Sequence, residues 1–198
     1  MSQRLILASG SASRRQLLEN AGIKAIAIKP NVDEETAKTA IRAQALSIGE
    51  QAMQLAELKA VKISKNEMGL VIGGDQMLAL GDQAFDKPKD LAGARSHLKA
   101  LSGQTHILET AIVIAQEGEI IWRHLARPHL TMRVLSDEFI VQYIDHLGDD
   151  LLSTVGGYKL ESLGSQLFSK IEGDYFSILG LPLLPLQDYL RARGVLQT

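Results

Sequence analysis

Apolar residues along the chain form short continuous runs that alternate with stretches of helical spacing. The run Leu5–Ala8 precedes the polar turn Ser9–Ser11, and apolar residues at helical spacing follow, which predicts a strand, a turn and a helix that ends at Gly22. Either Ser11 or Ser13 has the residue type and position of an N-cap for that helix. Ile23–Ile28 alternates well enough to predict a second strand.

The next segments are mostly helical, with one apolar strand after them. Pro30–Glu35 predicts an acidic loop, and Thr36–Lys65, rich in good helix formers, predicts one long helix or two with a break at Gly49. Leu70–Ile72 predicts a buried strand, and Gly73-Gly74-Asp75 is expected to form a tight turn at its carboxyl end.

The second half of the chain contains both patterns again. The elements expected there are a helix over Leu91–Leu101, a hairpin of His106–Ala115 and Ile120–His124, a strand over Leu130–Val134, a helix capped by Ser136 and a last helix that ends at Gly194. Alternation of strands and helices around an inserted hairpin predicts the α/β class with a mixed sheet.

Composition narrows the function classes. The chain has 198 residues, which suits one large domain or two small ones, and its net charge of −2 argues against binding to a nucleic acid polymer or an acidic membrane. It has no Cys, which excludes disulfides and thiolate sites and fits a reducing compartment. Its apolar runs are far shorter than the roughly 20 residues of a membrane span, and the four apolar residues after Arg4 are too few for a signal-peptide core, so we expect a cytoplasmic protein.

The turn after the first strand holds candidate phosphate ligands. Ser9 and Ser11 offer hydroxyl and backbone N–H groups, and Arg14 and Arg15 lie in the opening turn of a helix, where cations are unfavourable unless an anion lies between them. A solvated arginine pair on an exposed helix face is the alternative. The chain has no GxxxxGK[ST], GxGxxG or GxSxG motif, and its histidines have no metal-ligand spacing, so other common nucleotide and hydrolase sites have no support.

Two carboxylates and two lysines are further candidates. Asp75 and Glu34 could hold a divalent metal or orient a water, although an Asx turn and a solvated acidic loop are the alternatives. Lys59 lies nearer the apolar face of its helix than the polar one, and Lys87 precedes Pro88 in a loop. A lysine is more often a surface charge than a ligand, so a functional role for either one depends on whether the other candidate sites lie close to it.

Taken in this order, the motifs resemble the Maf family of nucleoside triphosphate pyrophosphatases, named for its link to septum formation. The matching segments are Leu5–Leu18, Val32–Glu34, Leu55–Ala60, Val71–Asp75, Lys87-Pro88, Leu101–Gly103 with His106, and Gly173–Leu183. They extend over nearly the whole chain.

The resemblance implies a single Maf-like domain over 1–198, with a Maf/ITPase-like fold: an elongated mixed β-sheet flanked by helices, and two lobes around a cleft. It also implies a homodimer, a divalent cation, typically Mg²⁺, and cleavage of a nucleoside triphosphate between the α and β phosphates, which removes modified or non-standard nucleotides from the pool. The functional positions it implies are Ser9, Arg14, Arg15, Glu34, Lys59, Asp75 and Lys87. Glu34 and Asp75 would hold the metal, and Asp75, or else Glu34, would act as base.

Differences between branches of the family bear on the substrate. Gln76, Lys159 and Glu161 look more like the branch that cleaves 7-methyl-GTP than the branch that cleaves dTTP and UTP. A carboxylate such as Glu161 can accept hydrogen bonds from a guanine edge and offset the charge of a methylated ring. Ser13 replaces the arginine or aromatic residue of the two branches, so that specificity contact is lost or replaced. The alternatives are a dTTP/UTP pyrophosphatase and a nucleotide-binding regulator of cell division with little catalysis.

Overall fold

The computed structural model describes residues 3–197, and these divide into two compact units. The first unit contains the described residues up to Gln76, together with Thr110–Ala126 and 174–197. The second unit contains Met77–Glu109 and Arg127–Gly173. Two long strands, β3 (Leu70–Leu80) and β5 (Thr105–Gln116), each contribute residues to both units.

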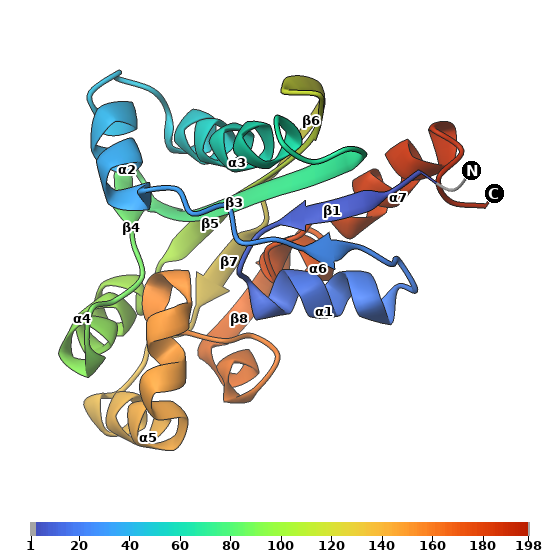
Figure 1. Cartoon of the computed structure of the whole chain (residues 1–198). Helices are drawn as coiled ribbons and strands as arrows, with labels where there is room; N and C mark the ends of the chain where they lie inside the picture. The colour runs from blue at the N-terminus through green and yellow to red at the C-terminus, as the bar shows by residue number, and fades with distance from the viewer. Residues whose placement is uncertain (1–2, 198) are drawn as a thin grey trace. The chain divides into compact units, whose positions relative to one another are not determined.

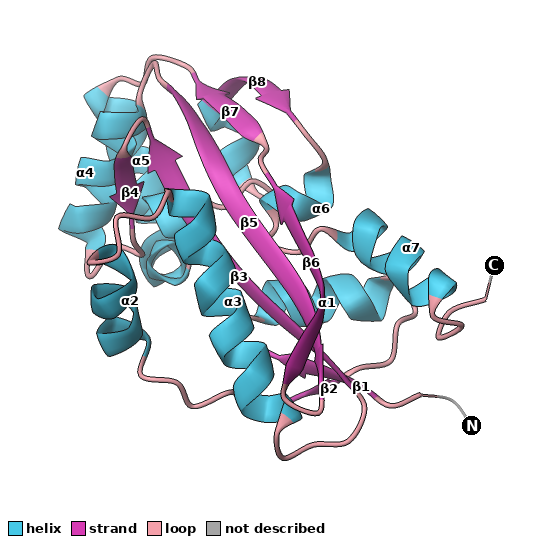
Figure 2. Cartoon of the chain, turned by 90° about the horizontal axis from the view of Figure 1, so that it is seen from above, coloured by secondary structure: helices cyan, strands magenta, loops and turns pink. Residues whose placement is uncertain are grey.

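The first unit is a mixed sheet with helices packed on it. Its other strands are β1 (Leu5–Ala8), β2 (Ile26–Ala27) and β6 (Glu119–Ala126). Its helices are α1 (Ala12–Asn20), α2 (Glu34–Arg42), α3 (Ile48–Ser64), α6 (Tyr175–Ile178) and α7 (Leu183–Ala192). β1 is parallel to β2 and to β3, whereas β6 is antiparallel to β5 (Figures 1 and 2).

Alternation along the strands gives this sheet two apolar faces. One face packs against α1 and α7, and its core residues from strands and helices are Leu5, Leu7, Leu70, Ile72, Ile112 and Ile114, with Leu17, Leu18, Leu183, Leu186 and Leu190. The opposite face lies under α3, which Figure 2 shows running along the strands.

The contact between α3 and the sheet depends on Gly73. A Cβ at this position would lie 2.4 Å from the backbone oxygen of Ala56 and 2.7 Å from the Cβ of Ala60, which is closer than atoms can approach. Small residues on α3 and glycine on β3 therefore bring helix and strand into close contact. The turn expected at Gly73-Gly74-Asp75 is wrong, because β3 continues through these residues and the glycines serve packing rather than chain reversal.

The second unit contains the remaining strands and helices. They are β4 (Gln83–Phe85), β7 (His129–Met132), β8 (Phe168–Glu172), α4 (Leu91–Leu101) and α5 (Asp137–Leu147). β4 pairs antiparallel with the end of β3, and β7 lies between β5 and β8. Three short 3-10 segments, Gly148–Ser153, Val155–Gly157 and Leu163–Leu167, follow α5, and the first two pack against α4.

The mixed α/β class is confirmed, and so are most of the expected helices and the hairpin of β5 and β6. The predicted position of the break in the long helical segment is wrong. The break lies before Ile48 rather than at Gly49, because Ser47 forms a capping box with Glu50 that starts α3. The predicted end of the acidic loop at Glu35 is wrong, since Asp33 caps α2 and Glu34 is the first helical residue.

Other differences concern short strands and one cap. β2 covers only two residues of the expected Ile23–Ile28. β4 has only three residues, too few for a strand pattern, and β8 was missed because almost every side chain in it is exposed. Ser11, not Ser13, caps α1. The expected elongated shape, the cleft and the single domain over 1–198 stay predictions. Within residues 3–197, no helix is long and apolar enough to cross a membrane.

Candidate active site

The phosphate-binding candidates Ser9, Ser11 and Arg14 lie together where β1 leads into α1. The hydroxyl of Ser9, which is buried, accepts from the backbone N–H of Ser11 at 3.1 Å and from Nη1 of Arg14 at 3.3 Å. Ser11 caps α1 by accepting from the backbone N–H of Arg14. A strand, a cap and the first turn of a helix thus place hydroxyl, amide and guanidinium groups at one point.

Arg14 is buried, although arginine is usually a surface residue. Its Nε donates to the carbonyl oxygen of Gly180 at 2.7 Å. Burial lowers the pKa of Arg14 from its usual value, and the negative charges of Asp75 and Glu34 oppose that shift. The side chain stays protonated, since an arginine keeps its proton in proteins. A cation held below the surface in this way is suited to an anionic ligand.

Two neighbouring candidates do not join this cluster. Arg15 is mostly exposed, and its Nε lies 3.9 Å from Glu19 Oε1, a weak ion pair along the helix surface. Ser13 is also exposed on α1. Of the two arginines predicted to bind phosphate, only Arg14 is therefore buried.

Lys59 connects the two candidate carboxylates. Its side chain on α3 is almost fully buried, and its Nζ lies 2.7 Å from Oδ1 of Asp75 on β3 and 3.1 Å from Oε1 of Glu34 on α2. Asp75 is buried as well, whereas the side chain of Glu34 is about half exposed. Residues far apart in the sequence thus form one charged cluster, as predicted for a shared site.

The register of the sheet explains how both clusters come together. Pairing of β1 with β3 runs from Leu5 with Leu70 to Ala8 with Gly73, and β3 then continues past the end of β1. Asp75 therefore lies within β3 rather than at its carboxyl end, but it does lie just beyond the carboxyl end of β1, where ligands of open α/β sheets bind. A Cβ on Gly74 would lie 3.2 Å from Nε of Arg14, so the glycine leaves room for the guanidinium.

Gln76 belongs to this unit too, on the opposite side of β3 from Asp75. Its Nε2 lies 2.8 Å from Oγ1 of Thr110 and 3.0 Å from the carbonyl oxygen of Ser177. Sequence reasoning missed Thr110, Ser177 and the carbonyl of Gly180 as partners of site residues. One signal in the sequence was available for this segment: Asp174 and Ser177 have the spacing of a helix N-cap, and Gly180 follows them.

The other three candidates lie in the second unit. Lys87 is exposed in the loop between β4 and α4. Lys159 forms an ion pair of 3.1 Å with Asp150, and its backbone N–H donates to the hydroxyl of Tyr143 at 3.2 Å. Glu161 is exposed. Burial is the main cause that raises the pKa of Tyr143 to about 12, and the negative charge of Glu161 adds to it. Their roles toward a substrate stay predictions.

The residues present fit a divalent cation in their chemistry. Glu34 and Asp75 supply carboxylate oxygens, the ligands that Mg²⁺ prefers. One oxygen of each carboxylate lies within ion-pair distance of Nζ of Lys59, so the two carboxylates are close together. Among residues 3–197, no group of three or more His, Asp or Glu side chains is arranged to hold a metal. A cation there would therefore need ligands from water or phosphate, which is usual for Mg²⁺.

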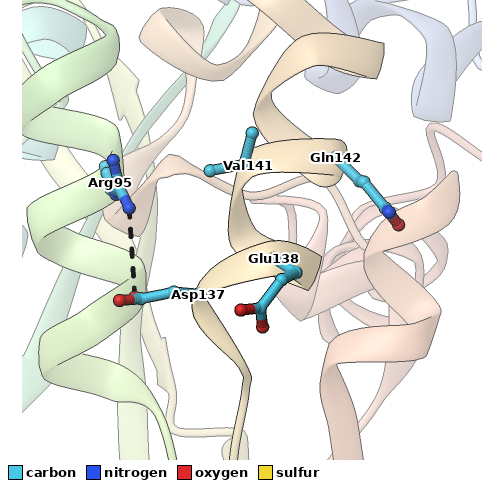
Figure 3. A pocket seen from close by; sticks show the side chains of 5 residues that line it. All are labelled: Arg95, Asp137, Glu138, Val141 and Gln142. Carbon is cyan, nitrogen blue, oxygen red and sulfur yellow. Dashed lines mark ion pairs between the residues drawn. The ribbon is translucent and has the colours of Figure 1, made fainter.

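The second unit also has a hollow of its own. It measures about 350 Å³ and is lined by Arg95, Asp137, Glu138, Val141 and Gln142. Figure 3 shows Arg95 and Asp137 directed toward one another, and Asp137 also accepts from Lys99 at 2.7 Å. None of the predicted site residues lines this hollow, and Arg95 and Asp137 form an ion pair of 4.0 Å between exposed side chains.

Comparison with known proteins shows the family of the chain. The family model described as Maf-like protein matches residues 4–193. The chain belongs to the Maf family. It is 64% identical over 198 residues to a nucleoside triphosphate pyrophosphatase of Hyphomonas neptunium, with all of both chains covered. It is 49% identical over 193 residues to a protein of the same name from Rhodospirillum rubrum, covering 97% of this chain and 96% of the relative.

A relative with a narrower name is similar at nearly the same level. The 7-methyl-GTP pyrophosphatase of Mesorhizobium japonicum is 46% identical over 197 residues, with 99% of each chain covered. Relatives of this Maf chain therefore have both a general and a specific name at comparable identity. Overall sequence identity therefore does not distinguish between the two names, and the substrate has to be inferred from the residues around the base.

Proposed function

We propose that this chain is a nucleoside triphosphate pyrophosphatase, which hydrolyses the α–β phosphoanhydride bond to give a nucleoside monophosphate and pyrophosphate. The observation that carries the proposal is the presence, in one unit, of a buried arginine at a helix start and a buried lysine bound to two carboxylates. The names of relatives that cover the whole chain support the same activity.

The phosphate chain is assigned to the turn between β1 and α1. Ser9, Ser11 and Arg14 present hydroxyl, backbone and guanidinium donors there, and the N-terminal end of α1 adds a partial positive charge. Arg15, one residue further along, is exposed, and a contact with the outer phosphates is part of the same proposal. Such donors favour the charge that builds on phosphoryl oxygens during in-line attack.

Charge balance supports a role for a divalent cation, for which we propose Mg²⁺. Arg14 and Lys59 are two cations, while Glu34 and Asp75 are two anions, so these four side chains have no net charge. A triphosphate brings several negative charges, which this cluster by itself does not offset. Bound by Glu34 and Asp75, the cation would supply that positive charge and polarise phosphoryl oxygens.

Asp75 is the group that we assign as general base. It is buried and fixed by Lys59, which leaves its second carboxylate oxygen to accept a proton from the attacking water. As that O–H bond breaks, a new P–O bond forms, and the anhydride P–O bond breaks to release pyrophosphate. Lys59 stabilises negative charge near the reacting phosphate, and Glu34 is the alternative base.

For the substrate we propose 7-methyl-GTP or another modified nucleotide. Glu161 is an exposed carboxylate, and Lys159 on the same segment is fixed by Asp150 and Tyr143, so the segment has polar groups suited to a purine edge. The name of the Mesorhizobium japonicum relative supports this choice. A homodimer, a cytoplasmic location and a role for Lys87 belong to the same proposal.

Pyrophosphate release, measured with Mg²⁺ on dTTP, UTP, CTP, GTP and 7-methyl-GTP, tests both levels of the proposal. We expect release that requires the metal and is fastest with 7-methyl-GTP. A preference for dTTP or UTP would keep the reaction and overturn the substrate. No release from any nucleotide by the folded protein would overturn the enzyme, and binding of the same nucleotides would then favour a regulator.

A further inference from the structure

Lys159 and Glu161 lie in a segment that is neither helix nor strand. This segment, residues 158–162, connects the 3-10 segments Val155–Gly157 and Leu163–Leu167. Because it has no regular hydrogen-bond pattern of its own, contacts with neighbouring elements have to fix its position. Whatever fixes this segment therefore also fixes the two residues that the proposed function places at the base.

A tyrosine of α5 holds the backbone of Lys159. The N–H of Lys159 donates to the hydroxyl of Tyr143 at 3.2 Å, and its carbonyl oxygen accepts from the hydroxyl of Ser162 at 3.3 Å. The side chain of Tyr143 is almost completely buried, and its ring stacks on that of Phe139 with 6.3 Å between the centroids. A packed ring on a regular helix has little freedom, so its hydroxyl offers Lys159 an acceptor at a defined point.

Gly164 shows how closely the backbone is packed at this contact. A Cβ at position 164 would lie 1.9 Å from the carbonyl oxygen of Lys159 and 3.2 Å from the hydroxyl of Tyr143. Two such atoms cannot approach to 1.9 Å, so a residue with a side chain would displace Lys159. Glycine is therefore needed at position 164 for Lys159 to reach the tyrosine hydroxyl.

Residues on both sides of Lys159 are buried. The hydroxyl of Tyr158 and Nε2 of His106 form a hydrogen bond of 2.7 Å, and both side chains lie in the interior. The side chain of Leu160 is buried as well. Glu161, in contrast, is exposed, so its carboxylate is accessible to a ligand while the backbone before it is fixed.

We propose that Tyr143 is a positioning residue for base recognition: by accepting from the backbone N–H of Lys159, its hydroxyl holds Lys159 and Glu161 in place toward the base of the nucleotide. The inference rests on the proposed function, since that function assigns the base to these two residues. Tyr143 acts through the segment 158–162 and not on the substrate itself. Loss of its hydroxyl therefore weakens the selection between bases and leaves the binding of phosphate unchanged.

Tyr143→Phe tests the proposal, because it removes the hydroxyl and keeps the buried ring. We expect the ratio of kcat/KM for 7-methyl-GTP to that for UTP to fall about threefold to tenfold, which corresponds to one lost hydrogen bond. The change should come from KM for 7-methyl-GTP, with kcat nearly unchanged. Binding of inorganic triphosphate, a ligand without a base, should be the same as in the wild type by calorimetry.

Tyr175→Phe is the matched control, because it removes the hydroxyl of a tyrosine whose side chain is half exposed. It should change neither the ratio nor triphosphate binding. A purely structural role of Tyr143 would lower the melting temperature of Tyr143→Phe without changing the ratio between two nucleotides.

A double-mutant cycle tests whether the effect passes through the segment 158–162. In a Glu161→Gln background, Tyr143→Phe should lower the ratio by a smaller factor than in the wild type. Full additivity would overturn the proposal, and so would an unchanged ratio in folded Tyr143→Phe or an equal loss for both nucleotides and triphosphate. Gly164→Ala displaces Lys159 while Tyr143 is intact; it should lower the ratio too, and it continues the test if Tyr143→Phe is unfolded by circular dichroism.

Failure of this inference is distinct from failure of the proposed function. Pyrophosphate release by the wild-type protein tests the reaction alone, and an unchanged ratio in an active Tyr143→Phe enzyme overturns only the inference. If the wild type binds nucleotides without hydrolysing them, the reaction is wrong, and the ratio of the two dissociation constants replaces that of kcat/KM. If the wild type does not favour 7-methyl-GTP over UTP, the assignment of the base to Lys159 and Glu161 is wrong, and the inference is overturned with it.

Discussion

Two polar clusters, one in each unit, are held together in different ways. In the first unit, Lys59, Asp75, Glu34 and Arg14 gather as formal charges, two of each sign. In the second unit, Nε2 of His106 and the hydroxyl of Tyr158 form a hydrogen bond of 2.7 Å in which neither group needs a charge. Both His106 and Tyr158 are buried, and the ring of Phe168 packs against each of them.

The difference shows what each cluster contributes. Burying charges costs free energy that their attraction does not always recover, and apolar replacements of buried ion pairs are often neutral or stabilising. A charged cluster therefore points to ligand binding rather than to stability. The neutral pair contributes to stability, and burial makes that contribution dependent on pH because it lowers the pKa of His106 to about 4.

The largest effect is expected from a substitution of Asp75, the proposed general base of the charged cluster. Asp75→Asn should reduce kcat by about a thousandfold or more, since proton transfer and metal binding are both lost. Lys59 retains Glu34 as a partner, so the fold should persist, with a melting temperature within a few degrees of the wild type. Steady-state pyrophosphate release and calorimetry measure the two quantities.

Asp145→Asn is the matched control, because Asp145 is an exposed carboxylate on α5. It should leave both rate and melting temperature unchanged. A near-normal rate in Asp75→Asn would remove Asp75 from the chemistry and give the role of base to Glu34.

The second prediction concerns the neutral pair and is intermediate in size. Between pH 6.5 and about 4 the unfolded chain binds a proton at His106 that the folded protein does not, so the free energy of unfolding falls as pH falls. This one group should account for a loss of about 3 kcal/mol by pH 4. Urea unfolding of wild type and His106→Gln at pH 7 and pH 4.5 measures it.

His106→Gln has no titrating group and should lose about 2 to 3 kcal/mol less than the wild type over that interval. His146→Gln, at an exposed position on α5, controls for loss of a histidine as such and should behave like the wild type. Equal pH dependence in all three proteins would mean that His106 is not held neutral.

The smallest expected effect sharpens the substrate assignment. Glu161→Gln keeps the size of the side chain but removes the charge that a guanine edge and a methylated ring would favour. The ratio of kcat/KM for 7-methyl-GTP to that for UTP should fall about fivefold to tenfold. Glu138→Gln, exposed on α5, should not change the ratio, and an equal loss for both nucleotides in Glu161→Gln would contradict the role.

Sequence periodicity predicted most helices because amphipathic spacing persists over several turns in them. It failed where the same residue type serves two purposes. Gly73 and Gly74 were expected to turn the chain, but they lie in a strand and make room for α3 and for Arg14. β8, with almost every side chain exposed, has no apolar alternation to detect.

The candidate site was predicted only in part, for a related reason. Ser9, Arg14, Lys59 and Asp75 carry recognisable motifs, and the structure brings them together in one unit. Thr110 and the carbonyl of Gly180 carry no motif, since a buried hydroxyl and a backbone oxygen acquire a role only through contacts between distant segments. The role toward the base that the sequence resemblance gives to Gln76 stays a prediction.

The close contact between α3 and β3 has a consequence for how this chain can vary. Lys59 lies between Ala56 and Ala60 in the helix, so the distance from its Nζ to Asp75 depends on how closely the backbone at position 73 allows α3 to approach. A larger residue at position 73 would push the helix outward and separate the ion pair, and a smaller residue at position 60 would not prevent this, because the nearest atom is the backbone oxygen of Ala56. Position 73 is therefore restricted to glycine, and the charged cluster depends on an absent side chain as well as on its own side chains.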